Sequence, residues 1–456
     1  MAPPFPFHVK EHVVPSQHVR EWPRATAASQ EDVLYLSVKQ YVPVDNPSPR
    51  PGDVTIIAAH ANGFPKELYE PLWADLHALS DHHSDPDRKK GEGTGFRIRG
   101  IWIADVSNQG YSGTLNERAQ GSDPSWDDHA RDLLHLTNVF RPQMPRPLVG
   151  LGHSFGAACL TRLSLLHPRL LSALVLLDPT ITAFSFARSV GPGQTPARAS
   201  SFRRETWPDR DAAAASFRRS PFYRAWDPRV LDAWIAHGVR STPTLLFPSS
   251  SPNDDKATLR TPKHQEVFTY FRPLWPHVRE VKSPDGSRSF VVDKDGAPDF
   301  DPAAQDEALT RDVVFPFYRS EGASILKHLP EVRPSVLWVF GGDSDLGQPE
   351  GRKFKLETCG VGGGGSGGLA AGRVAEVVME GRGHLFPMEV PGECARHAAA
   401  WIGKEMARWR EGEREYEEWT KLPLREKTTL SDKFLDNVGR PPSKGNKSLV
   451  SSESKL

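Results

Sequence analysis

Residues 148–160 join a strand-like segment to a helix-like segment through a turn that few folds accommodate. The apolar run 148–151 is typical of a buried strand. It leads into Gly-His-Ser-Phe-Gly at 152–156, and small and apolar residues at helical spacing follow as far as Leu166. Glycine on both sides of Ser154 removes the Cβ atoms that would crowd a sharp turn. This order predicts that Ser154 sits on a strained backbone with its hydroxyl exposed above a sheet.

Further short apolar segments indicate that this strand belongs to a parallel sheet. Two segments with helical spacing, 67–79 and 126–140, lie between strand-like runs. The strand-like runs are 32–41, 54–59, 98–104, 148–151, 173–177, 335–340 and 373–379. Continuous apolar strands separated by helices predict an α/β fold with a mostly parallel, doubly wound sheet covered on both faces. Ligand sites in such sheets lie beyond the carboxyl ends of the strands.

The order of the strand-like runs divides the 456 residues into four parts. Residues 1–179 and 335–420 are expected to form the two parts of the sheet core, the second ending in a surface helix. Residues 180–334, rich in Arg, Pro, Trp and Phe, are expected to form a cap or lid, and 421–456 a flexible tail. The glycine-rich run 360–368 is expected to be a flexible loop, because no Lys-Ser/Thr pair follows it to form a phosphate-binding loop.

Acyl transfer by a serine requires a nucleophile, a base, an acid that orients the base, and donors for the oxyanion. Ser154 is the candidate nucleophile, and the backbone N–H of Phe155 is one candidate oxyanion donor. The loop 60–65 follows an early strand, and its Gly63 would let the backbone approach a substrate oxygen. Phe64 or Asn62 could provide the second donor, and Phe64 is favoured.

The candidate base and acid are expected in the segments that follow the last strand-like runs. His384 follows the run 373–379, comes after the serine in the chain, and is the candidate base because a neutral imidazole can carry the serine proton. The turn after 335–340 reads Gly-Gly-Asp-Ser-Asp, where the position that usually holds the carboxylate falls nearer Ser344 than Asp343 or Asp345. Asp178, at the end of an earlier strand, is the alternative. Asp345 and Asp178 remain candidate acids of similar rank, ahead of Asp343.

Composition and charge narrow the class of protein. The chain has 57 Lys and Arg against 57 Asp and Glu, so its overall charge does not favour nucleic acid as a partner. No stretch reaches transmembrane length, and the first residues lack the apolar core of a secretory signal. The three cysteines have neither the number for a disulfide framework nor metal-ligand spacing. An intracellular protein with no metal and no cofactor is expected.

The last three residues match a known targeting signal. Ser454, Lys455 and Leu456 form the tripeptide recognised as a peroxisomal targeting signal. The stretch before them is rich in Ser, Lys, Gly and Pro, a composition typical of disorder, which would leave the tripeptide free. We therefore expect a peroxisomal location and an import receptor as a partner.

Three segments together resemble the α/β-hydrolase superfamily: His-Ala-Asn-Gly-Phe-Pro-Lys-Glu at 60–67, Gly-His-Ser-Phe-Gly at 152–156 and Gly-His-Leu-Phe-Pro-Met-Glu at 383–389. With the terminal Ser-Lys-Leu they more narrowly resemble fungal peroxisomal hydrolases implicated in host-selective toxin biosynthesis, which are similar to the yeast peroxisomal lipase. The resemblance covers about residues 30–180 and 335–405. It implies that Ser154 is the nucleophile and His384 the base, and the chain departs from it at the acid.

These observations predict a serine hydrolase that cleaves a small-molecule acyl ester or thioester through an acyl-enzyme, in peroxisomal lipid or secondary-metabolite metabolism. Residues 181–240 hold ten Arg against five Asp and Glu. That excess is either a solvated surface or a surface for the phosphates of an acyl-CoA. Two alternatives stay open on the same fold: a catalytically degenerate binding protein, and a hydrolase or lyase that cleaves carbon–carbon bonds.

Overall fold

A computed structural model describes residues 4–81, 94–183, 195–248, 256–273, 275, 277–282, 288–292 and 317–440. The chain forms two compact units, residues 1–406 and 407–456. The terminal tripeptide Ser454-Lys455-Leu456 lies outside the described residues.

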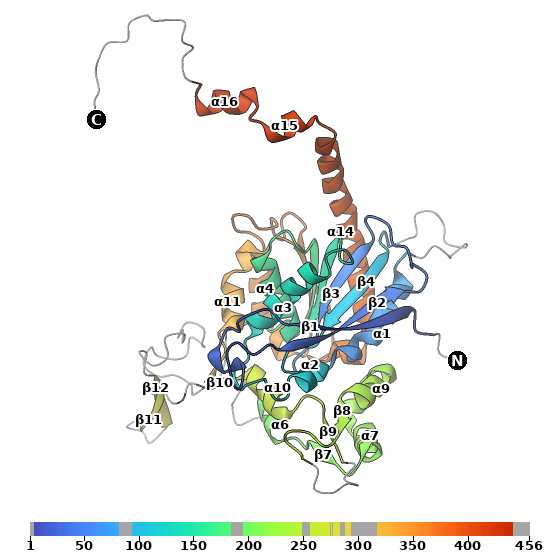
Figure 1. Cartoon of the computed structure of the whole chain (residues 1–456), viewed down its shortest axis with the longest axis vertical. Helices are drawn as coiled ribbons and strands as arrows, with labels where there is room; N and C mark the ends of the chain where they lie inside the picture. The colour runs from blue at the N-terminus through green and yellow to red at the C-terminus, as the bar shows by residue number, and fades with distance from the viewer. Residues whose placement is uncertain are drawn as a thin grey trace, which may run out of the picture. The chain divides into compact units, whose positions relative to one another are not determined.

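An eight-stranded sheet forms the centre of the first unit (Figure 1). The strand order is β1-β2-β4-β3-β5-β6-β14-β15, in which β1 and β2 are antiparallel to their neighbours and the other six strands run parallel. The bounds are β1 Phe7–Pro15, β2 Tyr35–Pro43, β3 Val54–Ala59, β4 Ile98–Ala104, β5 Leu148–His153, β6 Ala173–Leu177, β14 Ser335–Gly341 and β15 Val374–Met379. The expected parallel α/β sheet is confirmed, while β1, whose residues are mostly exposed, was not predicted.

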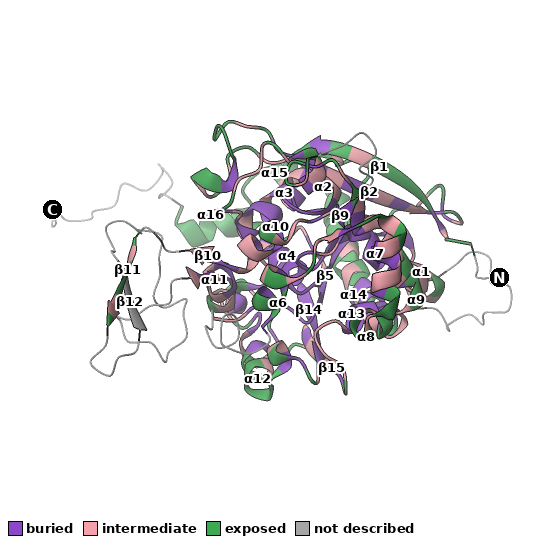
Figure 2. Cartoon of the chain, turned by 90° about the horizontal axis from the view of Figure 1, so that it is seen from below, coloured by how far each residue is buried: buried purple, intermediate pink, exposed green. Residues whose placement is uncertain are grey.

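Helices cover both faces of the sheet (Figures 1 and 2). Helices α3 and α4 pack on one face, and α1 with the first turns of α14 lies on the other. Every residue of β3, β5, β6 and β14 is buried, as expected for strands covered on both sides. The bounds are α1 Glu70–Leu79, α3 Trp126–Val139, α4 Phe155–Leu166, α12 Pro349–Thr358 and α14 Pro391–Thr420.

The order of the parallel strands reverses between β3 and β5. The chain passes from β3 outward to β4, and then returns to the other side of β3 to build β5, β6, β14 and β15 in sequence. Such a reversal opens a crevice at the carboxyl ends of the two central strands. The loop that begins at His60 and the turn at Ser154 leave the sheet at this crevice.

The segment between β6 and β14 builds smaller elements outside the main sheet. Its described strands are β7 Thr206–Trp207, β8 Val239–Ser241, β9 Ala257–Leu259, β10 Arg272–Pro273, β11 Val278–Lys282, β12 Arg288–Val292 and β13 Phe317–Tyr318. They form three small sheets, with orders β7-β9-β8, β10-β13 and β11-β12. Its described helices are α6 Pro196–Phe202, α7 Arg210–Arg219, α8 Pro221–Arg224, α9 Pro228–His237, α10 Lys263–Tyr270 and α11 Glu321–Lys327. The assignment of 180–334 as a cap remains a prediction that agrees with this arrangement.

Two segments expected to be flexible contain local hydrogen-bonded structure. In the expected tail, α15 (Leu424–Thr428) and α16 (Asp432–Val438) are helical. The glycine-rich run is a packed turn, because Gly360 N–H donates to Leu329 O and Gly362 N–H to Pro330 O. A Cβ at Gly365 would lie 2.5 Å from the carbonyl oxygens of Gly360 and Pro330, so glycine there allows backbones to touch.

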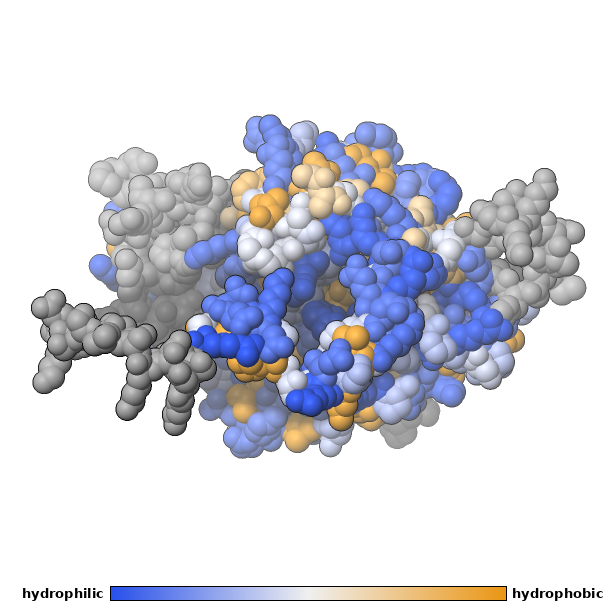
Figure 3. All heavy atoms as spheres, turned by 90° about the horizontal axis from the view of Figure 1, so that it is seen from above, coloured by the Kyte–Doolittle hydropathy of each residue, from blue (hydrophilic) through white to orange (hydrophobic). Residues whose placement is uncertain are grey.

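The surface of the chain is mixed in character. The face in Figure 3 is largely hydrophilic, with small separate groups of apolar residues. Among the described residues, no helix combines the length and the apolar character needed to cross a bilayer.

Buried histidines make the stability of the fold depend on pH. The His129 ring on α3 is fully buried, and among the described residues neither ring nitrogen has a hydrogen-bond partner. Burial, with a smaller effect of His60, lowers the pKa of His129 to about 3. The unfolded chain therefore binds more protons than the native state between pH 6.5 and 3. Across that interval the free energy of unfolding falls as pH falls, by about 1.4 kcal/mol per pH unit for each such ring.

We expect His129→Leu to flatten the pH dependence of stability below pH 6.5. Urea unfolding at pH 7, 6, 5 and 4 measures the slope for the wild type and the variant. His8→Gln, at an exposed position on β1, is the control and should keep the wild-type slope. Equal slopes for the wild type and His129→Leu would contradict the expectation.

Candidate active site

The turn at Ser154 is strained in the manner the sequence predicts. Ser154 has φ 56° and ψ −120°, a conformation that side-chain-bearing residues rarely adopt. A Cβ at Gly156 would lie 2.4 Å from the carbonyl oxygen of Ala59, and one at Gly152 would lie 2.8 Å from the backbone of Ala157. The glycines therefore let α4 begin directly against the ends of β3 and β5, with the serine held between them.

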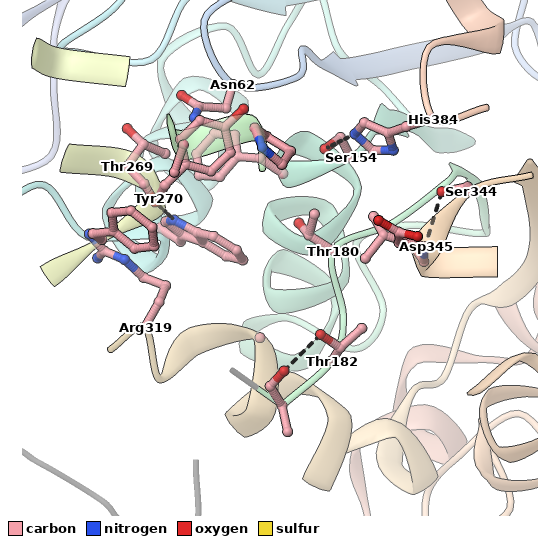
Figure 4. Close-up of a pocket in the computed structure, with 18 residues that line it drawn as sticks. Asn62, Ser154, Thr180, Thr182, Thr269, Tyr270, Arg319, Ser344, Asp345 and His384 are labelled. Carbon is pink, nitrogen blue, oxygen red and sulfur yellow. Dashed lines mark hydrogen bonds between the residues drawn. The ribbon is translucent and has the colours of Figure 1, made fainter. Parts of the chain in front are cut away.

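Three side chains from distant parts of the chain form one hydrogen-bonded line. Nε2 of His384 lies 2.9 Å from Oγ of Ser154, and Nδ1 of the same ring lies 2.6 Å from Oδ2 of Asp178. Figure 4 shows the contact between Ser154 and His384 at one end of a pocket. The structure thus brings together the predicted nucleophile, the predicted base and one of the three candidate acids.

Asp178, and not Asp345, is the carboxylate that reaches the histidine. The backbone turns at Asp178 with φ 42°, directly after β6, and its carboxylate is fully buried. Asp343 and Asp345 are exposed, and no hydrogen bond from either side chain to His384 is found among the described residues. The turn after β14 instead presents Ser344, whose hydroxyl donates to Oδ2 of Asp178 at 2.5 Å.

Hydrogen bonds keep the Asp178 carboxylate ionised despite its burial. Burial alone would raise its pKa, but hydrogen bonds from His384, from the Ser344 hydroxyl and from Gly341 N–H (3.0 Å to Oδ1) outweigh that effect and lower the pKa. An ionised carboxylate at Nδ1 orients the imidazole so that its other nitrogen can accept a proton from Ser154.

In the loop after β3, the structure favours Asn62 over Phe64 as an oxyanion donor. Phe64 N–H donates to Ala61 O at 3.2 Å, and the Phe64 ring packs against Trp226 and Trp234. Gly63, with φ 83°, closes this turn. Among the described residues no hydrogen bond uses the backbone N–H of Asn62 or of Phe155, and both residues line the pocket. The Ala61–Phe64 hydrogen bond is the reason the expected donor is not available.

A buried glutamine holds this loop in place. Oε1 of Gln109 accepts from Gly63 N–H at 2.7 Å, and its Nε2 donates to Oδ1 of Asn62 at 2.7 Å. The same Nε2 donates to the Thr269 hydroxyl on α10 at 3.0 Å, and the Asn62 amide donates to Glu266 O on that helix at 3.0 Å. The candidate oxyanion loop is therefore fastened both to the core and to the segment between β6 and β14. Nothing in the sequence pattern distinguishes Gln109 from a surface glutamine.

Ser154 and His384 line a cavity of about 230 Å³ whose walls are mostly apolar. Figure 4 shows Thr269, Tyr270 and Arg319 on the side of the cavity away from the Ser154–His384 pair. The apolar lining residues are Trp126, Phe155, Ala183, Pro196, Ala197, Phe271 and Leu346. The described residues contain no group of three or more His, Cys, Asp and Glu side chains arranged to hold a metal ion.

The family model described as alpha/beta hydrolase family matches residues 56–397 of the chain. The chain belongs to the alpha/beta hydrolase family. The match includes the loop after β3, the Ser154 turn and the His384 loop, so the expected fold and the expected class, a hydrolase, are confirmed.

Curated relatives of this hydrolase come from fungi. It is 40% identical over 427 residues to the type I acyl-CoA thioesterase mpaH' of Penicillium brevicompactum, covering 90% of this chain and 91% of that one. The abhydrolase domain-containing protein AFT2-1 of Alternaria alternata is 30% identical over 263 residues, 58% of this chain and 85% of that one. Among solved structures, the peroxisomal alpha-beta-hydrolase Lpx1 of Saccharomyces cerevisiae matches with a TM-score of 0.60 at 15% identity, covering 95% of each chain. That likeness concerns the fold.

The arginines of the hydrolase between residues 181 and 240 are largely used for internal contacts. Arg203, Arg218, Arg229 and Arg240 pair with carboxylates of the chain, and Arg210 donates to backbone carbonyl oxygens. Arg204 donates to Thr206 O and lies over the Trp207 ring. These six arginines have partners within the chain, which weakens the idea that the local excess of positive charge forms a surface for the phosphates of an acyl-CoA.

Proposed function

We propose that this hydrolase cleaves acyl thioesters, in the first place an acyl-CoA, through an acyl-enzyme on Ser154. The observation that carries the proposal is the line Ser154–His384–Asp178 at the wall of an apolar cavity. The name of the Penicillium relative, type I acyl-CoA thioesterase, supports the thioester as substrate, since the two chains are 40% identical over nine-tenths of their lengths.

In the first half-reaction, the Ser154 hydroxyl attacks the thioester carbonyl carbon while its proton passes to Nε2 of His384. Asp178 stabilises the resulting imidazolium at Nδ1, and the N–H groups of Asn62 and Phe155 stabilise the oxyanion. When the intermediate collapses, the carbon–sulfur bond breaks, and His384 returns the proton to the sulfur. The thiol leaves, and the acyl group remains on Ser154.

In the second half-reaction, water takes the place of the thiol. His384 accepts a proton from the water as its oxygen attacks the acyl-serine carbonyl. The Ser154 oxygen then leaves with that proton, and the carboxylic acid is released.

The size of the cavity supports an assignment of the acyl group to it. Its 230 Å³ is below the roughly 300–1,000 Å³ of sites that enclose a whole drug-sized ligand. An apolar acyl group fits such a space better than the charged nucleotide part of coenzyme A, whose phosphates would lose their hydration there. We infer that the acyl group enters and the coenzyme part stays outside.

The test is release of free thiol from a series of acyl-CoA thioesters by the purified chain, together with labelling by a fluorophosphonate and mapping of the modified peptide. We expect turnover and a single adduct on Ser154. A folded chain that gives neither would support the degenerate binding protein instead. An adduct without turnover of any ester or thioester would favour carbon–carbon cleavage on this fold.

We also propose that the hydrolase acts in peroxisomes, addressed by Ser454-Lys455-Leu456 through an import receptor. An N-terminal fluorescent fusion should be punctate and coincide with a peroxisomal marker, and deletion of the tripeptide should make it diffuse. A diffuse signal for both fusions would overturn the proposal.

A further inference from the structure

The residue before the nucleophile joins two loops of the site through its imidazole ring. His153 ends β5 and is fully buried. Its Nε2 lies 3.1 Å from the carbonyl oxygen of His384, and its Nδ1 lies 2.9 Å from the hydroxyl of Tyr69. That hydroxyl lies 2.8 Å from the backbone nitrogen of Ala61, the neighbour of Asn62. A buried chain of hydrogen bonds thus runs from the loop after β3 to the loop that carries the base.

The direction of every hydrogen bond in this chain follows from chemistry. Ala61 N–H can only donate, so the Tyr69 oxygen accepts from it, and the Tyr69 proton is free for Nδ1 of His153. Burial lowers the pKa of His153 to about 3, so the ring is neutral and carries its one proton on Nε2. That proton is donated to the carbonyl oxygen of His384, which can only accept. Each N–H, O–H and acceptor atom named in this hydrogen-bonded line therefore has a partner.

We propose that Tyr69 and His153 are positioning residues that hold the oxyanion loop and the base loop at a fixed separation. This inference rests on the proposed function, because it concerns the same reaction. Neither side chain is hydrogen-bonded to the Ser154 hydroxyl or to the His384 ring, although the His153 ring packs on the His384 ring with centroids 5.2 Å apart. Their effect is through backbone placement, since errors of about 1 Å in a catalytic geometry can cost about 10²-fold in rate.

Burial restrains the hydrogen-bonded line that joins Ala61, Tyr69, His153 and His384. Tyr69 is 2% exposed and His153 0%, so water cannot replace a lost partner without a cavity opening. Ala61 is held on its other side as well, because its carbonyl oxygen lies 2.8 Å from Nδ1 of His60, whose Nε2 accepts from Val106 N–H at 3.0 Å. The residue next to the candidate donor Asn62 is therefore anchored through both of its backbone polar groups.

The test compares Tyr69→Phe with Tyr41→Phe. Both replacements remove one hydroxyl from a buried ring, but the Tyr41 hydroxyl donates to Glu70 at 3.0 Å and has no contact with the site. We expect Tyr69→Phe to lower kcat and the rate of fluorophosphonate labelling about 10- to 100-fold with KM within about twofold. Tyr41→Phe should label and turn over at the wild-type rate, while thermal melting shows a comparable loss of stability in both variants.

A second measurement tests the hydrogen-bonded line in the wild-type protein, without any mutation. Nitrogen-15 NMR of the His153 ring in the wild type should show an unprotonated Nδ1 and a protonated Nε2, unchanged from pH 8 to pH 5. A proton on Nδ1, or a Tyr69→Phe enzyme that reacts as fast as Tyr41→Phe, would overturn the inference. A wild type that is neither labelled nor active would overturn the proposed function instead. The NMR result would still decide whether the hydrogen bonds of Tyr69 and His153 form as described.

Discussion

Asp178→Asn is expected to lower kcat by about 10⁴-fold while the protein stays folded. Asparagine is among the residues that tolerate positive φ, and its amide oxygen can keep the hydrogen bond from Gly341 N–H. Its NH₂ group then faces Nδ1 of His384 and the Ser344 hydroxyl. The imidazole has to accept at Nδ1 and carry its proton on Nε2, so it cannot take the proton of Ser154.

Asp345→Asn is the matched control for this prediction. Asp345 is the candidate acid that the sequence ranks with Asp178, but it is exposed. Of the candidate carboxylates, only that of Asp178 is found hydrogen-bonded to His384 among the described residues. Steady-state kinetics with one thioester should give Asp345→Asn a kcat within about twofold of the wild type. If Asp345→Asn loses the activity and Asp178→Asn retains it, the acid has been assigned to the wrong strand end.

Replacing Ser154 should abolish catalysis and reveal how much strain the turn stores. Ser154→Ala and Ser154→Gly both remove the nucleophile, so we expect each to lose at least about 10⁴-fold in kcat and all fluorophosphonate labelling. They differ in backbone strain. Alanine keeps the Cβ that makes φ 56° and ψ −120° costly, by about 1–3 kcal/mol, whereas glycine relieves that cost.

Ser154→Gly is therefore expected to be more stable than Ser154→Ala, by about 1 kcal/mol after the entropy that glycine adds to the unfolded chain is subtracted. Urea unfolding at pH 7 measures the difference. A glycine variant less stable than the alanine variant would mean that the turn is not strained. Retained labelling in either variant would move the nucleophile to another residue.

Local sequence was sufficient for most of the sheet. The strands β3 to β6 and β14 appear as apolar runs because nearly all of their residues are buried, and β15 also has an apolar run although it is only partly buried. The ends of these strands agree with the expected segments within one or two residues. The edge strand β1 was missed, since most of its residues face solvent and leave no apolar run. The tight turn at Ser154 could also be predicted from local sequence, because the two glycines that relieve its steric crowding lie within the same five residues.

The acid required the tertiary structure. Asp178 and His384 are 206 positions apart, and their meeting depends on how β6 pairs with β14. Leu177 pairs with Val339, so the residue that follows β6 lies beside the end of β14, where Gly341 N–H and the Ser344 hydroxyl can both donate to it. The sequence register pointed to Ser344 at the usual acid position, and the structure gives that serine a supporting hydrogen bond to Asp178.

The choice between Asn62 and Phe64 as the oxyanion donor also required the tertiary structure. Both follow β3, and which N–H stays available is decided by a turn hydrogen bond inside the loop and by the side chain of Gln109, 47 positions after Asn62.

The sequence by itself determined most strands of the central sheet, the serine turn, the chain order of the candidate nucleophile and base, and the family, because burial periodicity and turn sterics act within a few residues. Only the tertiary structure decided which carboxylate orients His384, which backbone N–H remains for an oxyanion, and which buried groups hold the two loops. Those are questions of distance and direction between residues that only strand pairing brings together.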